Sequence, residues 1–200
     1  MANQHPPRFR SPISVSVSEL LFRPFSRVAE IEGFSCGSRD LDDFLKTDEV
    51  QTYAEQGYGA TTLVWRDHEL VGYYTVGYGE LSTEELKRGR RRVKQSTLPG
   101  RFIEESMPAV KIGRVAVDRR HQNKGIGRII VSKIMDDTTN APSSPLLVVT
   151  RANPNSIGFW ERCGFIPVAD KPKKSTSGSL TLFFDLRRLN EPDIRADVPL

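Results

Sequence analysis

The segment from Val115 to Val131 constrains the fold of this chain more than any other. It reads Val-Ala-Val-Asp, then a polar stretch, then Gly-Ile-Gly and an apolar run, which is the pattern of a strand, a turn and a helix. Glycine lets the backbone approach a ligand closely, and the first N–H groups of a helix have no partner within it. The helix dipole adds partial positive charge there, and Lys124 and Arg128 add full charges. The segment therefore predicts an anion site that suits a diphosphate.

Two other phosphate-binding patterns fit this segment less well. A P-loop ends in Gly-Lys-Ser/Thr, whereas Arg128 and Ile129 follow Gly127. A dinucleotide-binding fingerprint requires a third Gly or Ala three positions after the second, where Ile130 stands. Taken alone, the segment is also compatible with an ordinary helix whose first turn is made more flexible by glycine.

Length and composition are those of one soluble enzyme domain. The chain has 200 residues, 38% hydrophobic and 27% charged, and its net charge of +4 permits a polyanionic partner without requiring one. Cys36 and Cys163 are far apart, so we expect no disulfide framework and a cytoplasmic location. No apolar run is long enough to span a membrane, and no His/Cys cluster has metal-ligand spacing, so we expect neither a membrane nor a metal as a partner.

The apolar pattern predicts an α+β fold with one mixed sheet. We expect strands in 21–31, 61–65, 70–76, 110–117, 146–150, 165–168 and 180–186, and helices after Ser38, through 50–53, over 125–137 and over 156–162. We expect one domain, 19–187, between flexible tails at 1–18 and 188–200. The connection over 79–108 is long enough that we expect it to be functional or disordered.

Two motifs resemble those of the GNAT acetyltransferases, which bind acetyl-coenzyme A. Gln122-Asn-Lys-Gly125-Ile-Gly127 is similar to the family's Gln/Arg-x-x-Gly-x-Gly/Ala pattern. The segment 155–165 resembles the next signature, Asn-x-x-Ala-x-x-Phe-Tyr-x-x-x-Gly-Phe, and follows at the right separation. The resemblance covers residues 20 to 187 and implies the GNAT fold, in which the fourth and fifth strands splay apart.

The resemblance implies an acetyl-CoA site and no metal. Strands that splay apart leave backbone groups without strand partners, and the amide-rich pantetheine arm of the coenzyme pairs with them. The implied cofactor-binding residues come from the fourth strand, the following loop and helix start, and the second motif: Val115, Ala116, Val117, Gln122, Asn123, Lys124, Gly125, Ile126, Gly127, Arg128, Asn155 and Phe159.

The resemblance also implies direct transfer of the acetyl group to a primary amine within a ternary complex. The amine must lose a proton, the thioester oxygen must be polarised by a backbone N–H near Val115, and the thiolate must be protonated. Many GNAT enzymes use the Tyr of Phe-Tyr as the last donor, but this chain has Trp160, whose indole N–H does not ionise near neutral pH. The catalytic candidates are Glu80 as base, with a water-mediated proton wire as the alternative, and Trp160 packed beside the thiol. The proton donor to the thiolate is then water, Tyr78, Tyr74 or Ser156.

The N-terminal half is also similar to GNAT toxins of toxin–antitoxin pairs, which acetylate the amino group of aminoacyl-tRNA. The similar segments are Phe34-Ser-Cys36-Gly37, Leu41-x-x-Phe44-Leu45 and Val71-Gly-Tyr73-Tyr74-Thr75. This likeness implies tRNA and an antitoxin as partners, with homodimers common in the family. Basic residues that would hold tRNA phosphates are Lys87, Arg88, Arg90, Arg91, Arg92 and Lys94.

Two other functions remain open on the sequence. One is a housekeeping N-acetyltransferase for a small amine or a protein amino group. The other is a non-catalytic CoA-binding module that binds RNA or a partner protein. A surface run of basic residues is often only solvated, so the segment 87–94 does not decide between them.

Overall fold

The computed structural model describes residues 15–26, 31, 33–82, 84–85, 106–168 and 178–190. The basic segment 87–94, for which tRNA binding is predicted, lies outside the described residues. Within the described part, no helix is both long enough and apolar enough to cross a membrane.

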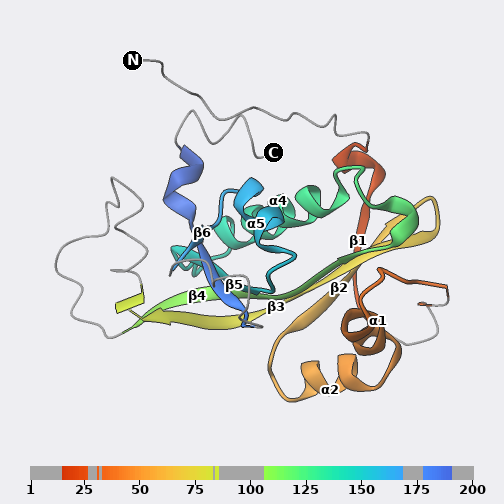
Figure 1. The fold of residues 1–200 in the computed structure, drawn as a ribbon, viewed down its shortest axis with the longest axis horizontal. Coiled ribbons are helices and arrows are strands. Elements are labelled where there is room, and N and C mark those ends of the chain that lie inside the picture. Colours follow the sequence, from red (N-terminus) through yellow and green to blue (C-terminus); the bar gives the residue numbers. More distant parts are fainter. Residues whose placement is uncertain are drawn as a thin grey trace.

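A seven-stranded mixed sheet forms the centre of the molecule (Figure 1). Its order is β1-β2-β3-β4-β5-β7-β6, and among the described strands every neighbouring pair is antiparallel except β4 and β5. The strands are β1 (Leu21–Pro24), β2 (Ala60–Arg66), β3 (Glu69–Ser82), β4 (Ser106–Val117), β5 (Leu147–Ala152), β6 (Ile166–Pro167) and β7 (Leu180–Asp185).

Helices cover both faces of the sheet, with α4 and α5 on one face and α1 and α2 on the other (Figure 1). They are α1 (Arg39–Lys46), α2 (Glu49–Glu55), α4 (Ile126–Thr139) and α5 (Ile157–Arg162), with short 3-10 helices η1 (Val17–Glu19), η3 (Arg119–His121) and η4 (Leu186–Asn190). The mixed α+β architecture expected from the sequence is confirmed.

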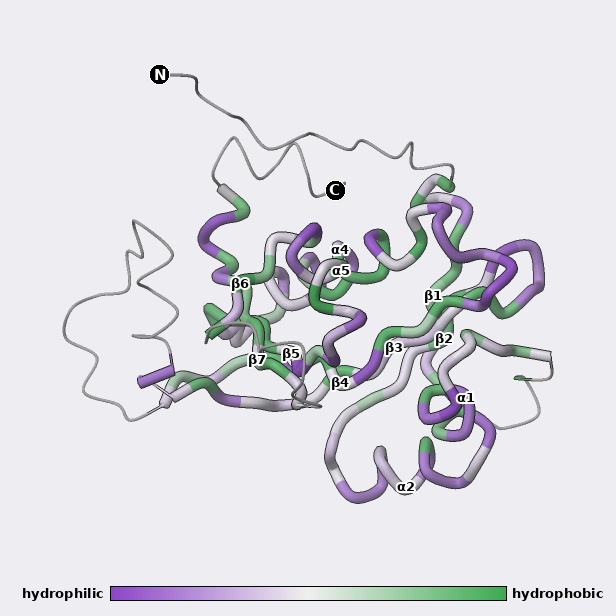
Figure 2. Tube along the Cα trace, in the orientation of Figure 1, coloured by the Kyte–Doolittle hydropathy of each residue, from purple (hydrophilic) through white to green (hydrophobic). Residues whose placement is uncertain are grey.

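The alternation of side chains along β3 divides the core between the two faces. Tyr74 packs with Ile130 and Ile134 of α4, whereas its neighbour Tyr73 packs with Phe44 of α1 on the opposite face. The Tyr73 hydroxyl donates a hydrogen bond to the Leu41 carbonyl at 2.7 Å, which fixes α1 to the sheet. Figure 2 shows α1 as mostly hydrophilic, so its few apolar side chains position the whole helix.

The parallel pair is the feature that shapes the site. β4 pairs with β5 only from Ala109 to Ile112, and the strand then continues to Val117 beyond that pairing. On its other side, β4 keeps pairing with β3, but Thr75 pairs with Arg114 and Val76 with Ile112. Gly113 is therefore an extra residue, a β-bulge at the place where β4 and β5 separate.

Several element limits differ from the sequence-based expectation. β3 runs to Ser82 and β4 starts at Ser106, so the expected connection over 79–108 begins and ends in strands. The first strand stops at Pro24 rather than near residue 31, although the N–H of Phe25 still donates to the Thr61 carbonyl of β2 at 2.8 Å. Val15 is buried and η4 continues the fold to residue 190, so the folded unit extends beyond the expected limits at 19 and 187 at both ends.

Candidate active site

Asp118 anchors the end of β4. Its carboxylate is 1% exposed and accepts hydrogen bonds from the N–H of Ser35 at 3.2 Å, and from the N–H and Nε of Arg120, both at 2.9 Å. Burial acts to raise the pKa of Asp118, but the hydrogen bonds from Arg120 and Ser35 outweigh it and hold the pKa at about 2. The charged carboxylate therefore ties the strand end to the chain entering α1.

The loop after Asp118 is held by its own polar side chains. The Gln122 amide nitrogen donates to the carbonyls of Cys36 at 2.8 Å and Val117 at 2.9 Å, and Lys124 Nζ donates to the Arg120 carbonyl at 2.8 Å. Both amide hydrogens of Gln122 are thereby used, and its remaining oxygen is an acceptor that does not bind phosphate. Gln122 therefore shapes the loop, while the anion-binding capacity lies in the main chain.

Two residues of the loop have left-handed backbone conformations that turn the chain into α4. Asn123 has φ 62° and Gly125, which caps the helix, has φ 89°. The Gly125 carbonyl accepts the N–H groups of Arg128 at 3.0 Å and Ile129 at 3.1 Å. The N–H groups of Ile126 and Gly127 belong to the first turn, where a helix has no internal acceptors for them. The helix start thus presents donors and the positive end of the dipole, the two features on which binding of a diphosphate depends.

Three distant segments meet beside this helix start. The side chain of Ile126 is buried in the core, so only its main chain is available to a ligand. A Cβ atom at Gly127 would lie 3.1 Å from the Phe159 ring and 3.8 Å from Val117. The structure therefore brings together β4, α4 and α5, which carry the two sequence motifs.

The edge of β4 leads directly into this loop. Val115 and Val117 are half-buried and pack on the core, and Ala116 pairs with Tyr73 of β3. Beyond Ile112 the described β5 offers no partner on the other side, although Thr150 still donates its hydroxyl to the Ile112 carbonyl at 3.1 Å. An open strand edge followed by a helix start fits an extended, amide-containing ligand that ends in a diphosphate.

The α5 candidates contribute packing and capping. Trp160 is 6% exposed, and its ring centroid lies 5.1 Å from those of both Phe159 and Phe165. The Ser156 hydroxyl donates to the Asn153 carbonyl at 3.1 Å at the helix start. Asn155 is exposed in the preceding turn, and Arg128 is half-buried on α4.

The two β3 candidates lie along the paired part of the β3–β4 hairpin. Tyr78 is 96% exposed and pairs with Val110, and Glu80 pairs with Pro108 and accepts a 2.8 Å hydrogen bond from the Ser106 hydroxyl. At about 3.4 Å per residue, Glu80 is roughly 14 Å along the strand from Val76, next to the bulge. The structure does not group these two side chains with the α4 start.

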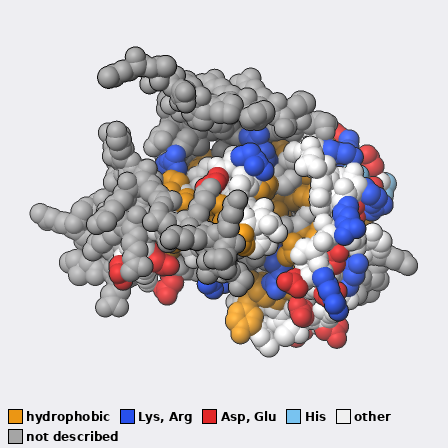
Figure 3. Space-filling model, viewed as in Figure 1, with side chains coloured by type: hydrophobic (Ala, Val, Ile, Leu, Met, Phe, Trp, Pro, Cys, Tyr) orange, Lys and Arg blue, Asp and Glu red, His pale blue; other side chains and the backbone are white. Residues whose placement is uncertain are grey.

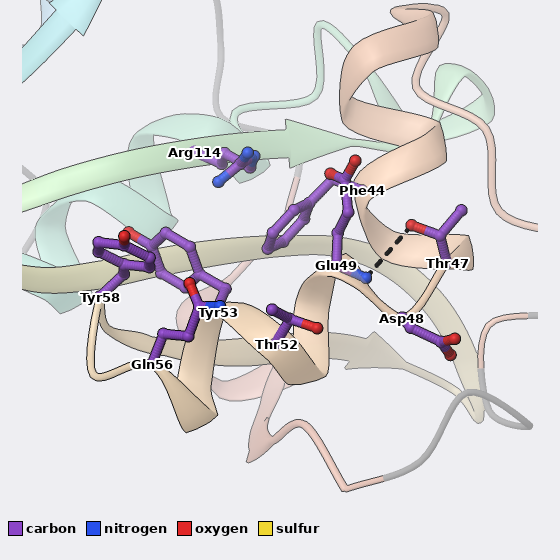
Figure 4. Close-up of a pocket in the computed structure, with 9 residues that line it drawn as sticks. All are labelled: Phe44, Thr47, Asp48, Glu49, Thr52, Tyr53, Gln56, Tyr58 and Arg114. Atoms are coloured by element: carbon purple, nitrogen blue, oxygen red, sulfur yellow. Dashed lines mark hydrogen bonds between the residues drawn. The ribbon is translucent and has the colours of Figure 1, made fainter.

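A cavity of about 500 Å³ lies on the opposite face, between α1, α2 and β4 (Figure 4). The Arg114 guanidinium reaches it from β4 and lies 3.7 Å from the centre of the Phe44 ring and 5.4 Å from that of Tyr53. These contacts are cation–π interactions that hold the charge in place. The cavity is lined by Phe44, Thr47, Asp48, Glu49, Thr52, Tyr53, Gln56, Tyr58 and Arg114.

The Tyr53 hydroxyl connects the cavity to the bulge. A Cβ atom at Gly113 would lie 3.0 Å from that hydroxyl and 2.7 Å from the Thr75 hydroxyl, so both oxygens flank the bulge where β4 leaves β5. The Thr75 oxygen is buried and has no hydrogen-bond partner among the described residues. Sequence reasoning missed Tyr53, although an isolated glycine inside a strand pattern is the usual signal of a bulge.

Neither cysteine has the character of a nucleophile. Burial raises the pKa of Cys163 to about 12 and that of Cys36 to about 11, so both remain thiols near neutral pH. The geometry therefore favours direct transfer over a cysteine-bound acyl group.

Known proteins share both the sequence pattern and the fold. Among curated sequences, a tRNA-acetylating toxin of Mycobacterium tuberculosis is 29% identical over 105 residues, which cover 52% of this chain and 57% of that protein. The matched region thus spans little more than half the length of that relative.

Three solved structures illustrate the fold. A structure described as a bacterial toxin superimposes with a TM-score of 0.68 at 16% identity, covering 85% of this chain and 92% of the other. AtaT complexed with acetyl-methionyl-tRNAfMet gives a TM-score of 0.63 at 20% identity, covering 85% and 96%. A mutant AtaT toxin has also been solved with acetyl-CoA and the C-terminus of the antitoxin AtaR, at a TM-score of 0.59 and 20% identity, covering 85% and 95%.

The family assignment rests on most of the chain. The model of the acetyltransferase (GNAT) family matches residues 17–165, which include the β4–α4 loop and α5. Together with the splayed strands and the glycine-capped helix start, this match shows that the chain belongs to the acetyltransferase (GNAT) family.

Proposed function

We propose that this chain acetylates the amino group of aminoacyl-tRNA with acetyl-CoA as donor, and that an antitoxin protein is a further partner. The observation that carries the proposal is the bulge at Gly113, because the open edge of β4 and the aromatic cavity meet there. The substrate assignment is supported by the likeness to the tRNA-acetylating toxin and to AtaT.

The cofactor would lie along the open edge of β4. The N–H groups of Ile126 and Gly127 would bind its diphosphate, with Asn123 and Lys124 beside them, and main-chain groups of Val115 and Val117 would pair with its pantetheine amides. When bound, acetyl-CoA supplies the acetyl group as an activated thioester. Gly127 leaves the room beside Phe159 that a side chain would fill.

The amine would enter from the cavity on the α1–α2 face. Asp48 and Glu49 line the cavity and attract the ammonium form, and the guanidinium of Arg114 offers donors to the oxygens of an anionic acceptor. Main-chain N–H groups at the bulge would polarise the thioester carbonyl.

The Tyr53 hydroxyl is the proton donor in this proposal. The ammonium group first releases one proton to solvent water. The neutral amine nitrogen would then form a bond to the acetyl carbon while the carbon–sulfur bond breaks, and Tyr53 would donate its proton to the leaving sulfur. The attacking amine returns a proton to Tyr53 through water. In many relatives a tyrosine of α5 donates this proton. In this chain Trp160 occupies that position and is packed in the core, so Tyr53 would donate the proton instead.

The proposal is tested with labelled acetyl-CoA and three acceptors: charged tRNA, the same tRNA without its amino acid, and a panel of small amines. We expect label only on charged tRNA, released together with the amino acid when the ester is hydrolysed. Label on small amines but not on charged tRNA would replace the proposal with the housekeeping alternative. Cofactor binding without any transfer would indicate the non-catalytic module.

A further inference from the structure

Tyr58 is a large aromatic side chain that the fold leaves in solvent. It lies in the turn between α2 and β2 (Figure 4), and it is 62% exposed. Figure 3 shows hydrophobic atoms exposed at the lower edge of the molecule, over this turn. Gly57 and Gly59 flank the tyrosine with φ of 74° and 154°, backbone conformations that residues other than glycine rarely adopt.

The turn is fixed against β3 rather than loosely attached. A Cβ atom at Gly59 would lie 2.2 Å from the Val76 carbonyl oxygen, and one at Gly77 would lie 2.1 Å from the Tyr58 carbonyl oxygen. The N–H of Tyr58 also donates to the Tyr53 carbonyl at 3.1 Å. Two glycines on facing segments thus let the backbone of the turn press onto the strand, which sets the position of the exposed ring.

The ring of Tyr58 continues the aromatic lining of the cavity outward. Its centroid is 5.8 Å from that of Tyr53 at an interplanar angle of 37°, and the Tyr53 hydroxyl lies at the bulge (Figure 4). The cavity therefore runs from the proposed proton donor to an exposed aromatic ring at its rim, with Arg114 on the β4 side. An acceptor whose amine reaches Tyr53 places its remaining atoms beside Tyr58.

We propose that Tyr58 is a stacking platform for the unpaired terminal base of the aminoacylated RNA end. This inference rests on the proposed function and extends it to the binding of the nucleotide. Single-stranded RNA ends are recognised largely by stacking of their bases on aromatic side chains, and a fixed ring keeps the ordering cost low. Such a contact selects an amine carried by a nucleotide over the same amine alone.

The test compares Tyr58→Ala and Tyr58→Trp with the wild type on two acceptors: an aminoacyl-tRNA and the ethyl ester of the same amino acid. We expect Tyr58→Ala to lower kcat/KM for the charged tRNA by about ten- to a hundredfold, as for loss of one base–aromatic stack, and to leave the ester reaction unchanged. Tyr58→Trp should restore the tRNA reaction. Tyr78→Ala is the control, because Tyr78 is also an exposed tyrosine but belongs to β3 and lies outside the cavity.

An equal loss on both acceptors would overturn the inference, since Tyr58 would then only maintain the shape of the cavity. No loss with charged tRNA would overturn it as well. If the wild type acetylates the ester but not the tRNA, the proposed function fails. Binding of a four-nucleotide single-stranded RNA then tests the platform separately: weaker binding to Tyr58→Ala supports it, and equal binding overturns it.

Discussion

The two sides of the sheet edge at Gly113 differ in whether main-chain or side-chain atoms form them. The side proposed for the cofactor consists of main chain: a strand edge and a helix start within the thirteen residues 115–127, positioned by side chains such as Gln122 that point into the loop itself. The side proposed for the acceptor consists of side chains: Phe44, Tyr53 and Arg114 from three separate elements. A main-chain site depends on backbone geometry and glycine, whereas the side-chain site depends on functional groups. Single substitutions can therefore impair one site and leave the other intact.

The largest effect is expected at Gly125, whose φ of 89° is strained for any β-branched residue. Gly125→Val should weaken acetyl-CoA binding at least about a hundredfold in calorimetry, because the loop and the first N–H groups of α4 no longer keep their geometry. Gly57→Val is the matched control: Gly57 has φ 74° and open space around its Cβ position, so it carries the same backbone strain in the turn between α2 and β2, away from the loop. Equal weakening by both substitutions would show a general loss of stability instead.

Tyr53→Phe should produce the next largest effect, and on the other side. Removing the hydroxyl at the bulge should lower kcat about a hundredfold, the lower range for a general acid, while the Kd of acetyl-CoA stays unchanged. Tyr78→Phe makes the same chemical change on the hairpin and should leave kcat as it is. If kcat fell only with Tyr78→Phe, the proton donor would be Tyr78 on β3 instead.

The smallest effect concerns the Asp118 anchor that both sides share. The pKa of this carboxyl is about 2 in the folded protein, below the usual value of about 3.9, so its charge contributes stability above about pH 4. That contribution should be lost as the pH falls from about 4 to about 2, seen as a falling thermal midpoint. Asp118→Asn should be less stable at pH 7 and should lose less on acidification. If the thermal midpoints of both proteins fell in parallel with pH, the charge of Asp118 would not contribute to stability.

The same difference explains how far the sequence predicts this molecule. The strand–loop–helix around Gly125 and Gly127 is contiguous and depends on glycine, so its pattern predicts the element order and the helix start that the structure shows, where the diphosphate site is proposed. Phe44 and Tyr53 have the spacing of ordinary helix core residues, and Arg114 is 61 residues from Tyr53 in a strand. Only the packing of α1 and α2 on the sheet brings them together, which no local pattern encodes.

The limits of the strands are the other feature that the sequence predicted poorly, because they too depend on long-range pairing. The hairpin of β3 and β4 is lengthened by pairing between residues 79–82 and 106–109, which are polar, glycine-containing or proline-containing and lack a clear strand pattern. The longer hairpin places Tyr78 and Glu80 along paired strands, whereas the sequence predicted a strand over 70–76, with Glu80 as the base and Tyr78 near the thiol.

Amide hydrogen exchange with and without acetyl-CoA is the sharpest test of a cofactor site made of main chain, because it observes the main-chain N–H groups themselves. If the site is as proposed, the cofactor slows exchange in residues 113–117 and at the start of α4, at Ile126 and Gly127, and leaves the α1–α2 lining of the cavity nearly unchanged. Protection confined to α1 and α2, with none along the edge of β4 or at the start of α4, would contradict it.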